Sequence, residues 1–151
     1  MLKKLLSLFE PRPAAAEPAA VDALPLAVAA LLVEAACADD RYDDDERALI
    51  GEILAAQFNL APTEAAALRK EGEQAQAEAF DIHRFTKIAK NMEPAEKTAL
   101  IERLWEIVLS DGERDPHEDA LVRRVCGLIY VSDPESGAAR ARVAARLSSR
   151  P

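Results

Sequence analysis

Two stretches of the sequence that begin 72 residues apart carry the same pattern of apolar and acidic residues. The first, LVEAACADDRYDDDERALIGEIL, starts at Leu32, and the second, LWEIVLSDGERDPHEDALVRRVC, starts at Leu104. From Glu34 to Leu54, six of the 21 paired positions are identical, and four of those six are acidic. Each stretch has the pattern of a helix end, an acidic loop and a helix start. The chain is therefore expected to contain two copies of one helical hairpin.

The composition favours helices throughout. Alanine, the best helix former, is abundant in the chain, whereas glycine (5 residues) and aromatic residues (5%) are scarce. A length of 151 residues is enough for one domain with its own core. We therefore predict an all-α fold of about seven helices in one bundle-like domain that is built from the two repeated hairpins.

Capping signals predict where most of these helices begin. Asp43 is followed three residues later by Glu46, and Ser132 is followed by Glu135, which is the spacing of a capping box. The first helix is expected over residues 25–38. The third, which follows Pro62, is expected to be weak and interrupted by Gly72.

Composition divides the chain into three parts. Residues 1–10 form a short basic and apolar segment, residues 11–23 a linker rich in proline and alanine, and residues 24–148 the helical domain. The apolar run from Leu5 to Phe9 is too short for a secretory signal or a membrane span. Residues Met1–Phe9 are expected to make at most weak peripheral contact with a membrane surface.

Charge and cysteine content narrow the function and the location. The net charge is −8 and the pI is about 4.8, so nucleic acid is not an expected partner. Cys37 and Cys126 lie in apolar stretches without a metal-binding spacing, which predicts reduced thiols in a cytoplasmic protein. Four arginines near the C-terminus are expected to be solvated or to pair with acids of the domain, and they are Arg140, Arg142, Arg146 and Arg150.

The acids of each hairpin repeat as E-x4-D-x3-D-x2-E, which lets four carboxylates approach one point at the loop. Two carboxylates about 4 Å apart repel by about 4 kcal/mol at an effective dielectric near 20, so a positive charge is needed among them. Oxygen ligands favour Ca²⁺ or Mg²⁺. The spacing is not that of an EF-hand loop. The candidate ligands are Glu34, Asp39, Asp43 and Glu46 in the first hairpin and Glu106, Asp111, Asp115 and Glu118 in the second.

A metal-independent explanation of four of these residues stays open. Asp43 with Glu46, and Asp115 with Glu118, have the spacing of helix caps, which stabilise a helix by about 1 kcal/mol without any ion. Asp39 and Asp111 follow a helix C-terminus, where the helix dipole disfavours an anion. A bound cation explains them better, and the alternative is that they are solvated loop acids.

The two motifs ADDRYDDDERALI and SDGERDPHEDALV, within an all-helical domain, resemble the tellurite-resistance protein TerB family over about residues 24–148. The likeness is closest to stand-alone TerB-like bacterial proteins. The family's alanine-aspartate-glycine turn and following glutamate fall on Ala38, Asp39, Asp40 and Glu46 in the first copy, with Asp40 in place of glycine. In the second copy they fall on Ser110, Asp111, Gly112 and Glu118.

The resemblance implies a seven-helix domain that binds divalent metal through its acidic hairpins. It also implies a stress-related binding or sensing module near the cytoplasmic face of the inner membrane, with a protein partner and no established catalysis. The alternative is a metal-independent helical scaffold for protein–protein interaction. A metal-assisted hydrolase is a third hypothesis that needs a pocket and an open coordination position.

Overall fold

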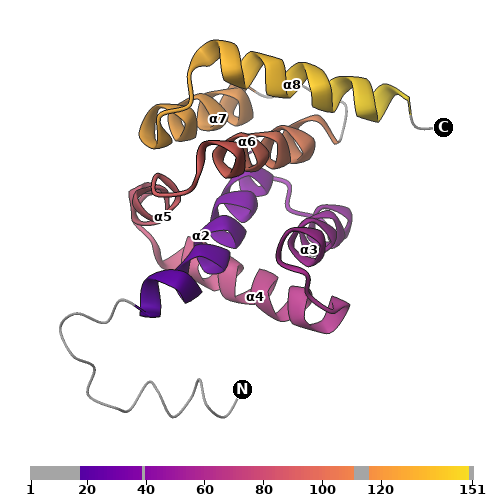
Figure 1. Cartoon of the computed structure of the whole chain (residues 1–151). Helices are drawn as coiled ribbons and strands as arrows, with labels where there is room; N and C mark the ends of the chain where they lie inside the picture. The colour runs from indigo at the N-terminus through magenta and orange to yellow at the C-terminus, as the bar shows by residue number, and fades with distance from the viewer. Residues whose placement is uncertain (1–17, 39, 111–115, 150–151) are drawn as a thin grey trace, which may run out of the picture.

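The computed structural model describes residues 18–38, 40–110 and 116–149, and within these ranges the chain is all-α (Figure 1). The predicted fold class and the predicted seven helices are confirmed for this part of the chain. The helices are α2 (Pro18–Cys37), α3 (Asp44–Phe58), α4 (Pro62–Glu78), α5 (His83–Ala89), α6 (Pro94–Leu109), α7 (Pro116–Ile129) and α8 (Asp133–Ser148).

Helix starts that the sequence marks with local capping residues lie where they were predicted. Asp43 has an extended backbone (φ −101°, ψ 179°) and caps α3, and Ser132 caps α8. Asp81 accepts a hydrogen bond from the backbone N–H of His83 at 2.8 Å, at the start of α5. These hydrogen bonds join residues only two or three positions apart, which explains why the sequence alone locates them.

The first helix differs from its prediction. It begins at Pro18, seven residues before the expected start, so residues 18–23 of the predicted linker belong to α2. Pro25 therefore lies inside the helix rather than in its first turn. The early start agrees with the alanine content of this segment, because alanine has the highest helix propensity.

The repeat is present in the helix boundaries themselves. Helices α2 and α6 end at Cys37 and Leu109, and α3 and α7 begin at Asp44 and Pro116, so both pairs are 72 residues apart. The stretches of sequence between these helices consequently have the same length. This agreement supports the predicted duplication of the hairpin.

The duplication extends to a third helix. Asn59 (φ 53°) follows α3 and Tyr130 (φ 66°) follows α7, both in the left-handed conformation. In each case the N–H of the next residue donates to the carbonyl oxygen five residues earlier. Leu60 N–H donates to Ala55 at 3.0 Å, and Val131 N–H donates to Cys126 at 2.9 Å. Such a turn ends a helix and reverses the chain. The next helices, α4 and α8, thus occupy equivalent positions. The described part of the chain consists of two three-helix units, α2–α4 and α6–α8, joined by α5.

The two units share one core. Helix α2 is buried over residues 27–36, apart from the half-buried Glu34, and contacts α3, α4, α5, α6 and α7. Helix α6 contacts α2, α3, α7 and α8 (Figure 1). The most extensive pairs are α2 with α4 and α6 with α8, which are equivalent in the two units. The apolar spacing of residues 100–109 predicts one buried face on α6. Leu100, Ile101, Leu104, Trp105 and Val108 are buried as predicted, whereas Leu109 is half-buried.

Gly72 does not interrupt α4, contrary to the sequence expectation. The helix is continuous from Pro62 to Glu78, and Gly72 is buried where α4 crosses α2. A Cβ atom at this position would lie 2.7 Å from the Cβ of Ala29 and 2.9 Å from its carbonyl carbon. The glycine therefore permits close approach of the two backbones.

Among the described residues, no helix is long and apolar enough to cross a membrane.

Part of the basic end of α8 pairs with α6, as expected. Glu102 bonds Arg142 Nε at 3.2 Å and Arg146 at 2.9 Å. Partial burial raises the pKa of the Glu102 carboxyl, but the hydrogen bonds from Arg146 and Arg142 outweigh it and lower the pKa below its ordinary 4.5. Arg150 lies outside the described residues.

We expect Glu102→Gln to destabilise the fold by less than about 1 kcal/mol at neutral pH, because the arginine partners are about half exposed. A carboxyl with a lowered folded-state pKa stabilises above its unfolded pKa and loses that effect as pH falls through the folded value. Urea unfolding of both proteins from pH 7 to pH 3 should therefore show the difference shrinking below about pH 4.5. A difference that grows on acidification would contradict this assignment.

Candidate functional site

The first hairpin places two candidate ligands on different helices. Glu34 lies in the last turn of α2, half-buried, and accepts a hydrogen bond from Gln76 Nε2 of α4 at 2.6 Å. Glu46 lies in the first turn of α3 and is only 8% exposed. Glu34 and Glu46 thus belong to the two helices that the segment from Ala38 to Asp43 connects.

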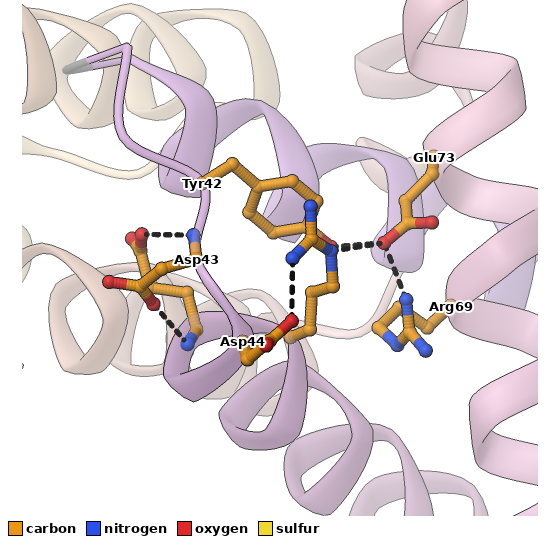
Figure 2. A network of polar contacts seen from close by, with 7 residues as sticks. Tyr42, Asp43, Asp44, Arg69 and Glu73 are labelled. Carbon is orange, nitrogen blue, oxygen red and sulfur yellow. Dashed lines mark hydrogen bonds and ion pairs between the residues drawn. The ribbon is translucent and has the colours of Figure 1, made fainter.

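Asp43 and Glu46 form the predicted capping box (Figure 2). The N–H of Glu46 donates to Asp43 Oδ1 at 2.9 Å, and the N–H of Asp43 donates to Glu46 Oε1 at 3.3 Å. The metal-independent role of these two acids is thus present in the structure. It does not decide whether they also bind an ion, since a carboxylate has two oxygens.

A second polar network beside the hairpin was not predicted. The hydroxyl of Tyr42 donates to Glu73 Oε2 at 2.5 Å, and Arg69 Nη1 donates to the same atom at 2.6 Å (Figure 2). The guanidinium of Arg47 lies 4.5 Å from the centre of the Tyr42 ring. Burial, and then the hydrogen bond to Glu73, raises the pKa of the Tyr42 phenol. The network fastens the loop to α4.

The thiol of Cys37, the last residue of α2, lies among the carboxylates of this region. Burial raises its pKa, and Glu34, Glu46 and Glu73 raise it further, to about 11 against an ordinary 9.0. Arg47 opposes this shift. Three carboxylates from three helices are thus close enough to act on one thiol.

We expect Cys37 to react slowly with iodoacetamide in EDTA-treated protein, because the thiolate is the nucleophile. A pKa of about 11 instead of 9.0 leaves about a hundredfold less thiolate at pH 8. The measurement is mass spectrometry of the Cys37 peptide after timed alkylation between pH 8 and pH 11.5. A rate that levels off near pH 9 would contradict the assignment.

In the second hairpin the two described candidate ligands are buried. Glu106, in the last turn of α6, is 9% exposed and bonds Arg103 Nη1 at 3.1 Å. Glu118, in the first turn of α7, is 1% exposed. Glu46 and Glu118 therefore share both helix position and burial, as the repeat predicts.

Three of the eight predicted ligands, Asp39, Asp111 and Asp115, lie outside the described residues. Within the described ranges, no group of three or more His, Cys, Asp or Glu side chains has the arrangement of a metal site. The predicted sets cannot be assembled from those ranges alone, since each needs at least one aspartate from beyond them. Cys37 and Cys126 are free thiols, as expected.

The fold and the repeated acidic sequence motifs define a class of protein: an all-helical domain of two duplicated units, each with a buried glutamate in the first turn of its second helix, Glu46 in one and Glu118 in the other. The family profile described as "Tellurite resistance protein TerB" matches residues 25–141. The chain belongs to the TerB family. No curated protein and no solved structure gives a significant match.

Proposed function

We propose that this chain is a TerB-family binding or sensing module, rather than an enzyme, and that its acidic hairpins hold a divalent cation. The cation would fix the two helix ends of each hairpin and so stabilise a surface for a protein partner. The proposed ligands are those that the repeat pattern identifies, Glu34, Asp39, Asp43 and Glu46 in one hairpin and Glu106, Asp111, Asp115 and Glu118 in the other.

The burial of three hairpin glutamates, two of them at equivalent positions, is the observation that carries this proposal. Glu46, Glu106 and Glu118 are each at most 9% exposed. A buried carboxylate is costly unless hydrogen bonds, cations or a metal compensate its charge. Position in the helix supplies such compensation for Glu46 and Glu118, which lie at helix N-termini.

Glu34 and Glu106 lack that compensation, because they lie in the last turns of α2 and α6. There the helix dipole disfavours a negative charge. Gln76 donates one hydrogen bond to Glu34, and Arg103 pairs with Glu106. A cation at the loop would compensate the negative charge of all four glutamates at once. Carboxylate oxygens are the ligands that Ca²⁺ and Mg²⁺ prefer.

The proposed cellular setting follows from the family and from the N-terminal segment. We place the module in the cytoplasm, near the inner membrane, in a stress response of the kind that the family description names. Residues Met1–Phe9, with Lys3 and Lys4, would add weak peripheral contact with anionic lipid. They lie outside the described residues.

Thermal unfolding tests the metal site. We expect a saturable rise in the melting temperature of EDTA-treated protein when Ca²⁺ or Mg²⁺ is added at constant ionic strength, with Mn²⁺ and Zn²⁺ titrated for comparison. A ligand that binds only the native state stabilises it by RT ln(1 + [L]/Kd). Replacing Asp39 and Asp111 together by asparagine should abolish this rise.

A matched control removes two charges elsewhere. Asp45→Asn with Glu52→Gln changes the net charge by the same amount at exposed positions of α3, and it should keep the metal-dependent rise. An equal rise in wild type and in the Asp39/Asp111 variant would exclude the proposed ligands. No rise with any ion would exclude the metal function.

The Asp43–Glu46 capping box favours a second candidate function, a metal-independent helical scaffold for protein–protein interaction. In that case the acids stabilise helix ends, and the partner binds a helical surface. The two functions separate in the same experiment, because a scaffold has a melting temperature that EDTA and divalent ions leave unchanged.

A further inference from the structure

A pocket of about 290 Å³ lies between α6, α7 and α8, apart from the acidic hairpin residues. It contains an aromatic ring, a hydroxyl group and two guanidinium groups, together with two carboxylates. The side chains that matter for its chemistry are Trp105, Ser136, Arg123, Arg140, Asp119 and Asp133. Trp105 Nε1 donates to the hydroxyl oxygen of Ser136 at 3.1 Å, which fixes the position of the ring.

Arg140 has no acceptor in this pocket. Its guanidinium lies 5.4 Å from the centre of the Trp105 ring, and its Nε is buried without a hydrogen-bond partner among the described residues. Leaving a buried donor unpaired is unfavourable. Stacking on an indole holds a guanidinium in place but satisfies none of its N–H groups.

The repeat shows which partner Arg140 lacks, namely a carboxylate. With the N-caps Ala61 and Ser132 as reference, α4 and α8 are related by an offset of 71 residues, which pairs Arg69 with Arg140. In α4, Arg69 is bound by the carboxylate of Glu73, one turn later. The residue at the corresponding place in α8 is Ala144. The second unit has therefore kept the arginine but lacks its carboxylate.

We propose that this pocket binds a carboxylate supplied from outside the domain, with Arg140 as the principal contact, as Glu73 is bound by Arg69 in the first unit. The carboxylate belongs either to a small free acid or to an acidic side chain of a peptide. This site is independent of the proposed metal site.

The charges of the pocket select a ligand with one negative charge. Arg123, from α7, is an exposed second cation at the same pocket. Asp119 and Asp133 bring the formal charge of the four groups to zero. Repulsion from these aspartates disfavours phosphate and other polyanions. A monocarboxylate keeps a planar, bidentate fit to a guanidinium.

Trp105 reports binding directly, because it is the single tryptophan of the chain. Sodium acetate is titrated against sodium chloride at constant ionic strength, and tryptophan fluorescence and the indole N–H resonance are followed. We expect a saturable change with acetate and none with chloride. Arg140→Gln should abolish it, whereas Arg124→Gln, the same charge change at an exposed position of α7, should preserve it.

A second variant keeps Arg140 and fills the site. Ala144→Glu places a carboxylate four residues after Arg140, with the spacing of Arg69 and Glu73. It should weaken acetate binding about tenfold or more, as the loss of a charge-assisted hydrogen bond does. Ala141→Glu adds the same charge without an arginine three or four residues away and should bind acetate like wild type.

Two probes distinguish the sources of the carboxylate. The capped peptide Ala-Ala-Glu-Ala-Ala is compared with acetate and with the same peptide containing glutamine. Saturable binding of either carboxylate supports the site, and tighter binding of the glutamate peptide identifies a protein ligand. Binding of neither, or equal effects of acetate and chloride, would overturn the proposal, as would unchanged acetate binding in Ala144→Glu.

Discussion

Replacing Gly72 by alanine will lower the free energy of unfolding by about 2 kcal/mol, although alanine is the better helix former. The added methyl group would lie 2.7 Å from the Cβ of Ala29, 2.9 Å from the carbonyl carbon of Ala29 and 3.1 Å from the backbone nitrogen of Ala30, all in α2. Backbone atoms cannot move aside as the end of a flexible side chain can. The helix α2 would have to shift away from α4, in the most extensive helix pair of the first unit. Urea unfolding followed by circular dichroism measures the loss.

Gly51→Ala is the matched control for this prediction. Gly51 lies within α3, and a Cβ atom there has no neighbour within 4 Å. The same substitution should therefore stabilise the protein by about 0.5–1 kcal/mol through helix propensity alone. Equal stabilisation by both substitutions would show that α2 and α4 do not approach closely at Gly72.

The contrast between these glycines shows what the sequence could and could not reveal. Both stand inside segments of helical pattern, and local propensity treats them alike. Gly72 differs because Ala29, 43 positions earlier in the chain, lies against it. The reason for a glycine at that place is a contact between distant segments, which periodicity and capping signals do not encode.

The same distinction applies to the candidate sites. Capping by Asp43 and Ser132 was predictable, since each cap bonds a residue three positions later. The contact of Tyr42 with Glu73 spans 31 positions, as does that of Trp105 with Ser136. Neither has a spacing signal. A comparison of the two repeats along their full length would have paired Arg69 with Arg140, but only the structure shows which arginine has a carboxylate.

Duplication followed by divergence accounts for these differences between the units. Both copies have the two hairpin glutamates, and burial is shared by Glu46 and Glu118, whereas Glu34 is half-buried and its counterpart Glu106 is buried. The third helices have diverged, because α4 carries Glu73 and closes its polar network, whereas α8 carries Ala144 and leaves Arg140 open. The shared and the divergent features therefore support two separate sites.

Replacing Leu104 by alanine should lower the free energy of unfolding by about 3 kcal/mol, within the usual range for a buried leucine. Leu104 is fully buried on α6, the helix that contacts both its own unit and helices α2 and α3 of the other. Because the units share this core, the loss should appear in a single cooperative transition. Fluorescence of Trp105, in the second unit, and circular dichroism, from all helices, should give the same midpoint.

Leu109→Ala provides the comparison on the same helix. Leu109 is half-buried at the end of α6, so the same truncation should cost clearly less than at Leu104. If Leu104→Ala instead separates the fluorescence and dichroism transitions, the units fold independently, and α6 does not couple them. A single transition in both variants means that an event at one unit, such as a cation at its hairpin, changes the stability of the other. The proposed sensing function requires this coupling, because a ligand bound at one site must alter the surface at another.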